Sequence, residues 1–106
     1  MSEVFVIVST KHTLPRHKYV TFWRPNSAGY CWPLSWAGHY DADGAAKAVG
    51  VPDGHKPDSF AVPLNVALAL SRPPEAGYID GDAGPVVPKA KMRALRAAAV
   101  SLQPSQ

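Results

Sequence analysis

Runs of apolar residues separated by a turn signal occupy the first third of the chain. The apolar positions of Glu3–Ser9 are continuous rather than alternating, which is typical of a central strand covered on both faces. Tyr19–Arg24 and Tyr30–Leu34 are aromatic and β-branched segments that predict two further strands. Between them, Pro25–Gly29 carries the proline, asparagine and glycine that favour a hairpin turn. Because Pro33 cannot donate to a sheet, the last strand is expected to lie at an edge or to end there.

Two short helices are predicted in the middle of the chain. Asp41 is a candidate N-cap for a helix over Ala42–Val49, with Gly50 as the residue that follows its C-terminus. Phe60–Val62 indicates a brief extended segment. Pro63–Leu70 then predicts a second helix, because proline fits a first helical turn.

The clearest helical pattern lies near the C-terminus, over Pro88–Leu102. One apolar stripe at helical spacing is formed by Met92, Leu95, Ala99 and Leu102. The elements together predict one α+β domain over residues 1–106. Its small antiparallel β-sheet of about three strands would pack against this C-terminal helix, and the two short helices would close one end.

Aromatic residues are concentrated in the predicted hairpin and the segment after it: seven of the ten lie between Tyr19 and Tyr40. One interpretation is that they form the core, against the C-terminal helix. The other is that both faces of the hairpin carry large rings, so that some remain exposed and bind a partner. The candidate partner-binding residues are Arg24, Tyr30, Trp32, Trp36 and Tyr40.

The charges are unevenly distributed along the chain. Residues 1–40 hold four Lys or Arg against one acid, residues 41–88 hold three against seven, and residues 89–106 hold four against none. The acidic middle can pair with the basic ends, or the ends can present a basic face to a polyanion. The second possibility makes direct nucleic-acid binding the alternative function, with Arg16, Lys18, Lys89, Arg93 and Arg96 as candidate contacts.

Catalytic and metal-binding signatures are missing from the sequence. The histidines and the single cysteine, at positions 12, 17, 39, 55 and 31, follow no structural zinc spacing. Asp80-Gly81-Asp82 begins like a calcium loop but does not continue as one. We therefore expect no cofactor and no bound metal, and assign no catalytic residue. A small hydrolase using His and Asp residues is the third hypothesis. Cys31 with His39 would need a third, orienting group for nucleophilic catalysis, and no family signature surrounds either residue.

One cysteine excludes an internal disulfide and favours the cytoplasm, and the first apolar run is too short for a signal sequence or membrane span. No membrane partner is expected.

The segments WRPNSAGYCWPLSWAG and IDGDAGPVV resemble segments of small uncharacterised proteins encoded in phages and prophages. This resemblance implies a small phage accessory protein in the bacterial cytoplasm. Such a protein would act without catalysis, by binding a bacterial host protein or complex, including a defence system that it inhibits. The resemblance assigns no site residue.

Overall fold

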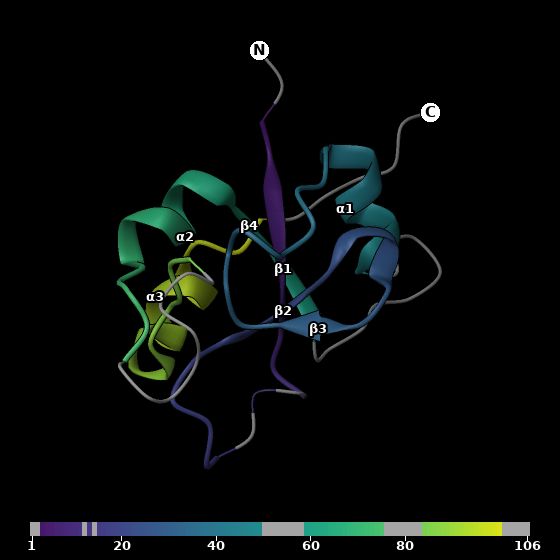
Figure 1. Ribbon diagram of the computed structural model, residues 1–106. Helices are drawn as coiled ribbons and strands as arrows, with labels where there is room; N and C mark the ends of the chain where they lie inside the picture. The colour runs from purple at the N-terminus through teal and green to yellow at the C-terminus, as the bar shows by residue number, and fades with distance from the viewer. Residues whose placement is uncertain (1–2, 12, 14, 50–58, 76–83, 101–106) are drawn as a thin grey trace.

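The computed structural model describes residues 3–11, 13, 15–49, 59–75 and 84–100. Within them, four strands form one antiparallel sheet in the order β3-β2-β1-β4 (Figure 1). The strands are β1 (Phe5–Ser9), β2 (Thr21–Trp23), β3 (Tyr30–Cys31) and β4 (Ser59–Pro63). The predicted α+β class, with an antiparallel sheet and a C-terminal helix, is confirmed, and the sheet has one strand more than expected.

Strand β1 lies in the middle of the sheet, as its continuous apolar run predicts. It pairs with β4 along its whole length and with the start of β2 at its own C-terminal end. Because side chains alternate along a strand, Phe5 and Ile7 pack into one cluster of buried residues while Val6 and Val8 pack into another. Both faces of β1 are therefore covered.

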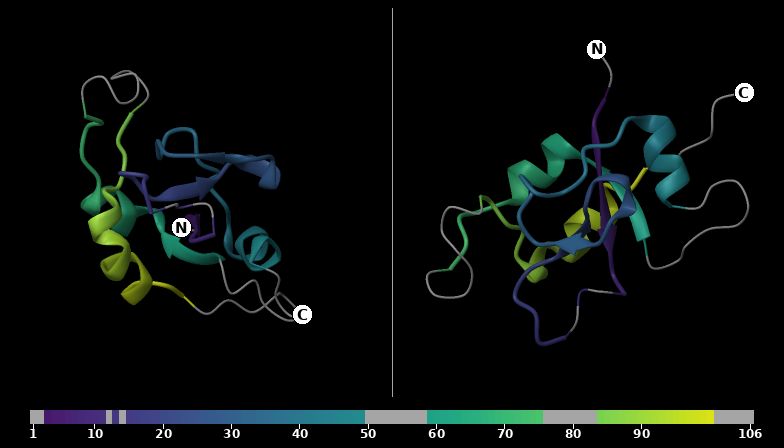
Figure 2. Two further views of the ribbon diagram at one scale, coloured as in Figure 1. Left: turned by 90° about the horizontal axis from the view of Figure 1, so that it is seen from below. Right: turned by 45° about the vertical axis from the view of Figure 1, so that its right-hand side comes forward.

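Helices lie on both faces of the sheet (Figures 1 and 2). Helix α1 (Ala42–Ala48) packs on the face of Phe5 and Ile7. Helices α2 (Leu64–Leu70) and α3 (Met92–Ala97), the latter preceded by the 3-10 turn η3 (Lys89–Lys91), pack on the opposite face. The expectation that the two short helices close one end together is wrong, because each covers a different face of β1.

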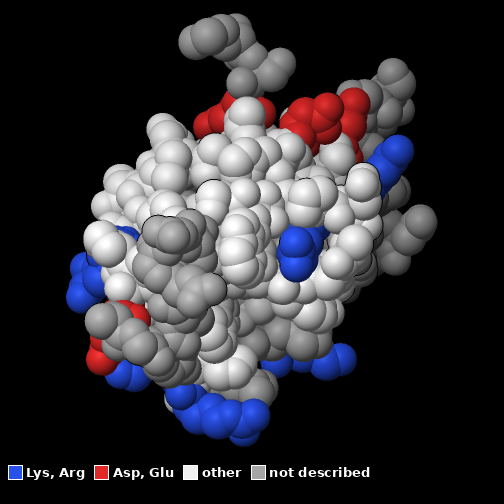
Figure 3. Space-filling model, in the orientation of Figure 1, with Lys and Arg blue, Asp and Glu red and all other residues white. Residues whose placement is uncertain are grey.

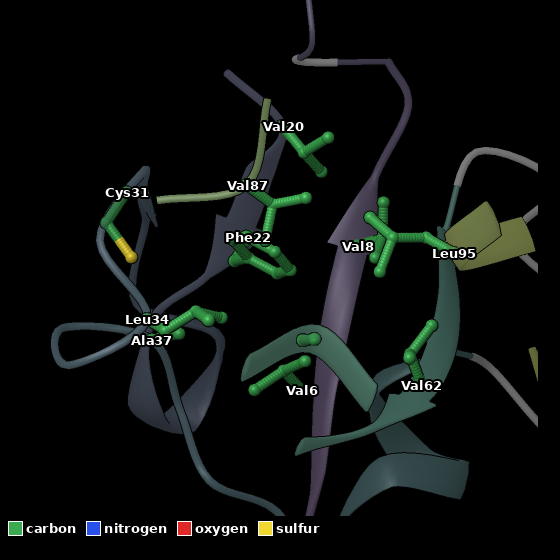
Figure 4. Close-up of a cluster of buried hydrophobic side chains, with 11 residues drawn as sticks. Val6, Val8, Val20, Phe22, Cys31, Leu34, Ala37, Val62, Val87 and Leu95 are labelled. Atoms are coloured by element: carbon green, nitrogen blue, oxygen red, sulfur yellow. The ribbon is translucent and has the colours of Figure 1, made fainter. Parts of the chain in front are cut away.

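The larger cluster lies between the sheet and helices α2 and α3. Figure 4 shows side chains from the strands and from distant segments converging there. Among them are Phe22 of β2, Leu95 of α3, and Val87 from the segment before η3. All three are fully buried. The stripe predicted on the C-terminal helix thus anchors that helix through Leu95.

The C-terminal helix is shorter than the predicted Pro88–Leu102. It ends at Ala97. Beyond it the chain is no longer helical, and Val100 pairs with Ala61 of β4, donating its N–H to the Ala61 carbonyl at 3.0 Å. Ala99 is consequently exposed rather than packed, and Leu102 lies outside the described residues. No helix in the described part of the chain is long and apolar enough to cross a membrane.

The local signals for helix α1 and for the hairpin turn are confirmed. Asp41 caps α1, its Oδ1 accepting from the Gly44 N–H at 2.7 Å, while Gly50 lies outside the described residues. The turn contains the short 3-10 segment η1 (Pro25–Ser27). Asn26 and Gly29 adopt positive φ of 59° and 104°, the region that these two residue types tolerate best. The two hairpin strands are shorter than predicted, and β3 ends before Pro33.

Candidate protein-binding surface

The hairpin of β2 and β3 sets two aromatic rings side by side. Its register places Trp23 directly opposite Tyr30, and the two ring centroids are 4.4 Å apart in a tilted arrangement. At the base of the turn the Arg24 N–H donates to the Gly29 carbonyl at 2.9 Å. The Trp23 indole is also held at its edge, where Nε1–H donates to Ser59 Oγ of β4 at 3.3 Å.

The segment after β3 crosses the end of β2 and is fixed there by backbone hydrogen bonds. The Trp36 N–H donates to the Pro33 carbonyl at 3.1 Å, which closes a turn. The Gly38 N–H then donates to the Trp23 carbonyl at 2.9 Å. Tyr40 and Phe5 exchange two N–H···O bonds of 2.8 Å, so the segment ends in an isolated antiparallel bridge to the first residue of β1.

Five side chains of these two segments lie around the turn end of the hairpin, where Trp23 contacts Tyr30, Arg24 contacts Trp36, and the Tyr40 hydroxyl reaches the Arg24 backbone. We call this surface the rim patch; it consists of Trp23, Arg24, Tyr30, Trp36 and Tyr40. Trp36 is 49% exposed and Tyr30 is 37% exposed, while Trp23 and Tyr40 are partly buried. The exposed Arg24 guanidinium lies 5.9 Å from the centre of the Trp36 ring, within the range of a cation–π contact.

A close approach of backbone to ring fixes Tyr40 in the rim patch. Gly38 is buried beneath the Tyr40 ring, and a Cβ at position 38 would lie 2.5 Å from Tyr40 Cε1. The same ring is anchored at its far end, where Tyr40 Oη–H donates to the Arg24 carbonyl at 2.5 Å. The sequence analysis did not identify Gly38 as a residue of this surface. Its only sequence signal is that a glycine stands two residues before an aromatic residue, Tyr40.

Figure 3 shows the face on which the hairpin lies. Its middle is largely uncharged, with acidic side chains at the top and most basic side chains along the lower and left edges. The rim patch joins large rings to the Arg24 guanidinium, a combination suited to burying apolar area and making one directed polar contact.

Trp32 was expected among the partner-binding residues, but it packs with His17 and Tyr19 and not with the rim patch. It contacts His17 and Tyr19 edge-on, with centroid separations of 5.2 and 5.8 Å. Its Nε1–H donates to Thr21 Oγ1 at 3.2 Å. Trp32 is thus partly buried at the end of the hairpin away from the turn, whereas Arg24, Tyr30, Trp36 and Tyr40 gather at the rim patch.

The candidate nucleic-acid contacts also divide into two groups. The Lys89 N–H donates to the Lys18 carbonyl at 2.8 Å, so these two residues are neighbours despite their distance in sequence. Arg16 lies two residues from Lys18, and Arg93 one turn beyond Lys89. Arg96, one turn beyond Arg93 on α3, contacts a different element, with its guanidinium 5.1 Å from the centre of the Phe60 ring on β4.

The sulfur of Cys31 has the surroundings of a core residue. Its thiol donates to the Pro33 carbonyl at 3.6 Å. Burial raises the pKa of Cys31 to about 11, and the nearby positive charge of Arg24 opposes this only in part. The thiol is therefore protonated at neutral pH and is a poor nucleophile. His39 Nε2 lies 3.1 Å from the Leu34 carbonyl oxygen, to which it donates.

Among the residues that the structure describes, no three His, Cys, Asp or Glu side chains lie close enough to hold a metal ion. His12, His55 and the Asp80-Gly81-Asp82 segment lie outside those residues.

A scan against protein-family models and searches of curated proteins and of solved structures found no match to this chain.

Proposed function

We propose that this chain is a non-enzymatic binding protein whose rim patch docks on a bacterial host protein. In the context that the resemblance to phage proteins implies, it is an accessory protein that occupies a host or defence-system surface. The observation that carries the proposal is the half-exposed Trp36 indole beside the Arg24 guanidinium, on a backbone fixed at both ends.

The composition of the rim patch supports protein recognition. Tryptophan, tyrosine and arginine are the residues most enriched among those that dominate the binding energy of protein interfaces. Trp36 and Tyr30 are the two most exposed aromatic side chains in the described part of the chain, and they lie at the same end of the hairpin.

The rigidity of the patch supports the same function. The backbone of Trp36 closes a hydrogen-bonded turn, Tyr40 is held through its backbone and its hydroxyl, and Trp23 is held through its indole N–H. Side chains that are already positioned lose less conformational entropy on binding, by about 0.5–1.5 kcal/mol for each one that need not be ordered. The partner surface that fits is an apolar pocket for the indole with a carboxylate at its edge for Arg24.

The experiment is affinity capture from a nuclease-treated bacterial lysate, comparing wild type with Trp36→Ala and with Leu68→Ala. Leu68 is a matched control because it is 46% exposed, similar to Trp36, but belongs to α2 and not to the rim patch. We expect one protein to be captured by wild type and Leu68→Ala and lost with Trp36→Ala, while all three show the same circular dichroism spectrum.

Undiminished capture by Trp36→Ala, or equal loss with Leu68→Ala, would contradict the proposal. Arg24→Ala gives a second test that leaves every ring in place. It should weaken capture and slow association at low salt, because a charge at the edge of an interface acts mainly on encounter.

A further inference from the structure

A second surface combines basic and aromatic side chains at the other end of the hairpin. It forms where the chain before β2 pairs with the chain before η3. Tyr19 and Pro88 form an antiparallel bridge, flanked by the bond from the Lys89 N–H to the Lys18 carbonyl. The basic residues on these two segments and on the helical turns that follow Pro88, which we call the basic cluster, are Arg16, Lys18, Lys89, Lys91 and Arg93.

The Lys89 side chain of the basic cluster crosses the junction. Lys89 Nζ donates to the Pro15 carbonyl, which lays its ammonium group along the segment that carries Arg16. Arg16, Lys91 and Arg93 are exposed. In Figure 3, basic side chains gather along the lower left of the molecule, with acidic atoms beside them.

The carboxylate at this surface is replaceable by a polyanion. Glu75 Oε2 accepts from Lys18 Nζ at 2.7 Å, with the two side chains 60% and 49% exposed. Ion pairs as exposed as this one contribute little to folding and are weakened by salt. A phosphate that approaches Lys18 therefore displaces a weak partner rather than a structural one.

Aromatic rings continue from the basic cluster. His17, next to Lys18 in sequence, and Trp32 are both partly exposed and contact each other edge-on at 5.2 Å. Trp32 is held by its hydrogen bond to Thr21 and by the buried Tyr19 ring. A basic track with rings beside it is the arrangement by which proteins bind single strands, because phosphates follow the charges while bases stack on the rings.

We propose that this junction binds single-stranded nucleic acid, with phosphates at the basic cluster and bases against Trp32 and His17. This activity goes beyond the proposed function and uses a different surface. Duplex nucleic acid fits less well, because its bases are stacked inside and cannot reach the rings.

The test is fluorescence anisotropy with a labelled oligothymidine of about 20 nucleotides, long enough to cover a site of this kind. Five phosphate contacts predict an affinity loss of about 100-fold between roughly 50 and 200 mM salt, from the dependence of single-strand binding on counterion release. The variant Arg16→Gln/Lys91→Gln/Arg93→Gln should bind more weakly and flatten the log–log salt slope by about 2.

Two controls separate this site from general positive charge. Lys91→Gln and Lys47→Gln each remove one exposed positive charge, but Lys47 lies on α1 and should leave the affinity unchanged. An abasic oligonucleotide of equal length keeps the phosphates and loses the bases, so it should bind at least about 5-fold more weakly if bases stack. No complex at low salt, equal effects of the two lysine variants, or equal affinity for the abasic strand would each overturn the proposal.

Discussion

Gly38→Ala adds one methyl group in a place where the structure has no room for it. The new Cβ would lie 2.5 Å from Tyr40 Cε1, 2.8 Å from Cζ and 2.9 Å from Oη. Distances below 3.0 Å are not tolerated between such atoms, so the ring or the backbone must move. The backbone of Gly38 is outside the left-handed region, so the cost comes from the clash with the ring and not from the conformation of alanine.

The cost follows from what holds the ring. Tyr40 is bonded through its hydroxyl to the Arg24 carbonyl and through its backbone to Phe5. Moving the ring loses a hydrogen bond worth about 1 kcal/mol. Overpacking of a well-packed site typically costs about 1–3 kcal/mol. We therefore expect Gly38→Ala to lower the free energy of unfolding by about 2 kcal/mol, and Tm by about 10 °C for a domain of this size.

A double-mutant cycle measured by urea unfolding tests the reasoning. In a Tyr40→Ala background the methyl group of Gly38→Ala has no ring to meet. In that background Gly38→Ala should leave the free energy of unfolding unchanged, or raise it by about 0.4–1 kcal/mol because alanine restricts the unfolded chain. The interaction energy between the two sites should therefore reach about 2 kcal/mol. An equal loss from Gly38→Ala in both backgrounds would refute the proposed contact.

Three further predictions concern the helices and the core. Asp41→Ala should lower the free energy of unfolding by about 1 kcal/mol, because the Gly44 N–H loses its acceptor, whereas Asp41→Asn should retain most of it; thermal melts distinguish the two. Leu95→Ala should cost about 2–5 kcal/mol in urea unfolding, since this fully buried side chain anchors α3, and a loss below 1 kcal/mol would contradict that role. The pKa of Cys31 is raised from 9.0 to about 11 in the folded state, so the unfolded chain binds fewer protons between these values and stability falls as pH rises through this window. The stability difference between wild type and Cys31→Ala should therefore shift against wild type by up to about 1.4 kcal/mol per pH unit between pH 9 and about 11, and a pH-independent difference would show that the thiol is not desolvated.

Features set by neighbouring residues could be predicted from the sequence. The continuous apolar run of β1 indicated a strand covered on both faces, the aspartate before α1 indicated its cap, and Asn26 and Gly29 indicated the hairpin turn. The concentration of rings after Tyr19 left two interpretations open, a core or an exposed surface; Trp36 and Tyr30 are exposed, while Tyr19 and Phe22 are buried. Each of these depends on local backbone preference or on a repeat along one element.

Contacts between distant segments were decided only in the tertiary structure. Nothing near Ser59–Pro63 shows that it pairs with β1, and nothing near Val100 shows that it leaves its helix for Ala61. The division of the aromatic residues between two ends of the hairpin depends on which segment crosses β2. The meeting of Lys18 with Lys89 depends on the bridge between Tyr19 and Pro88. The sequence alone thus determined the local elements, because their signals lie within a few residues. The two candidate binding surfaces required the tertiary structure, because each is built from segments whose pairing is selected by burial of the whole core rather than by any local preference.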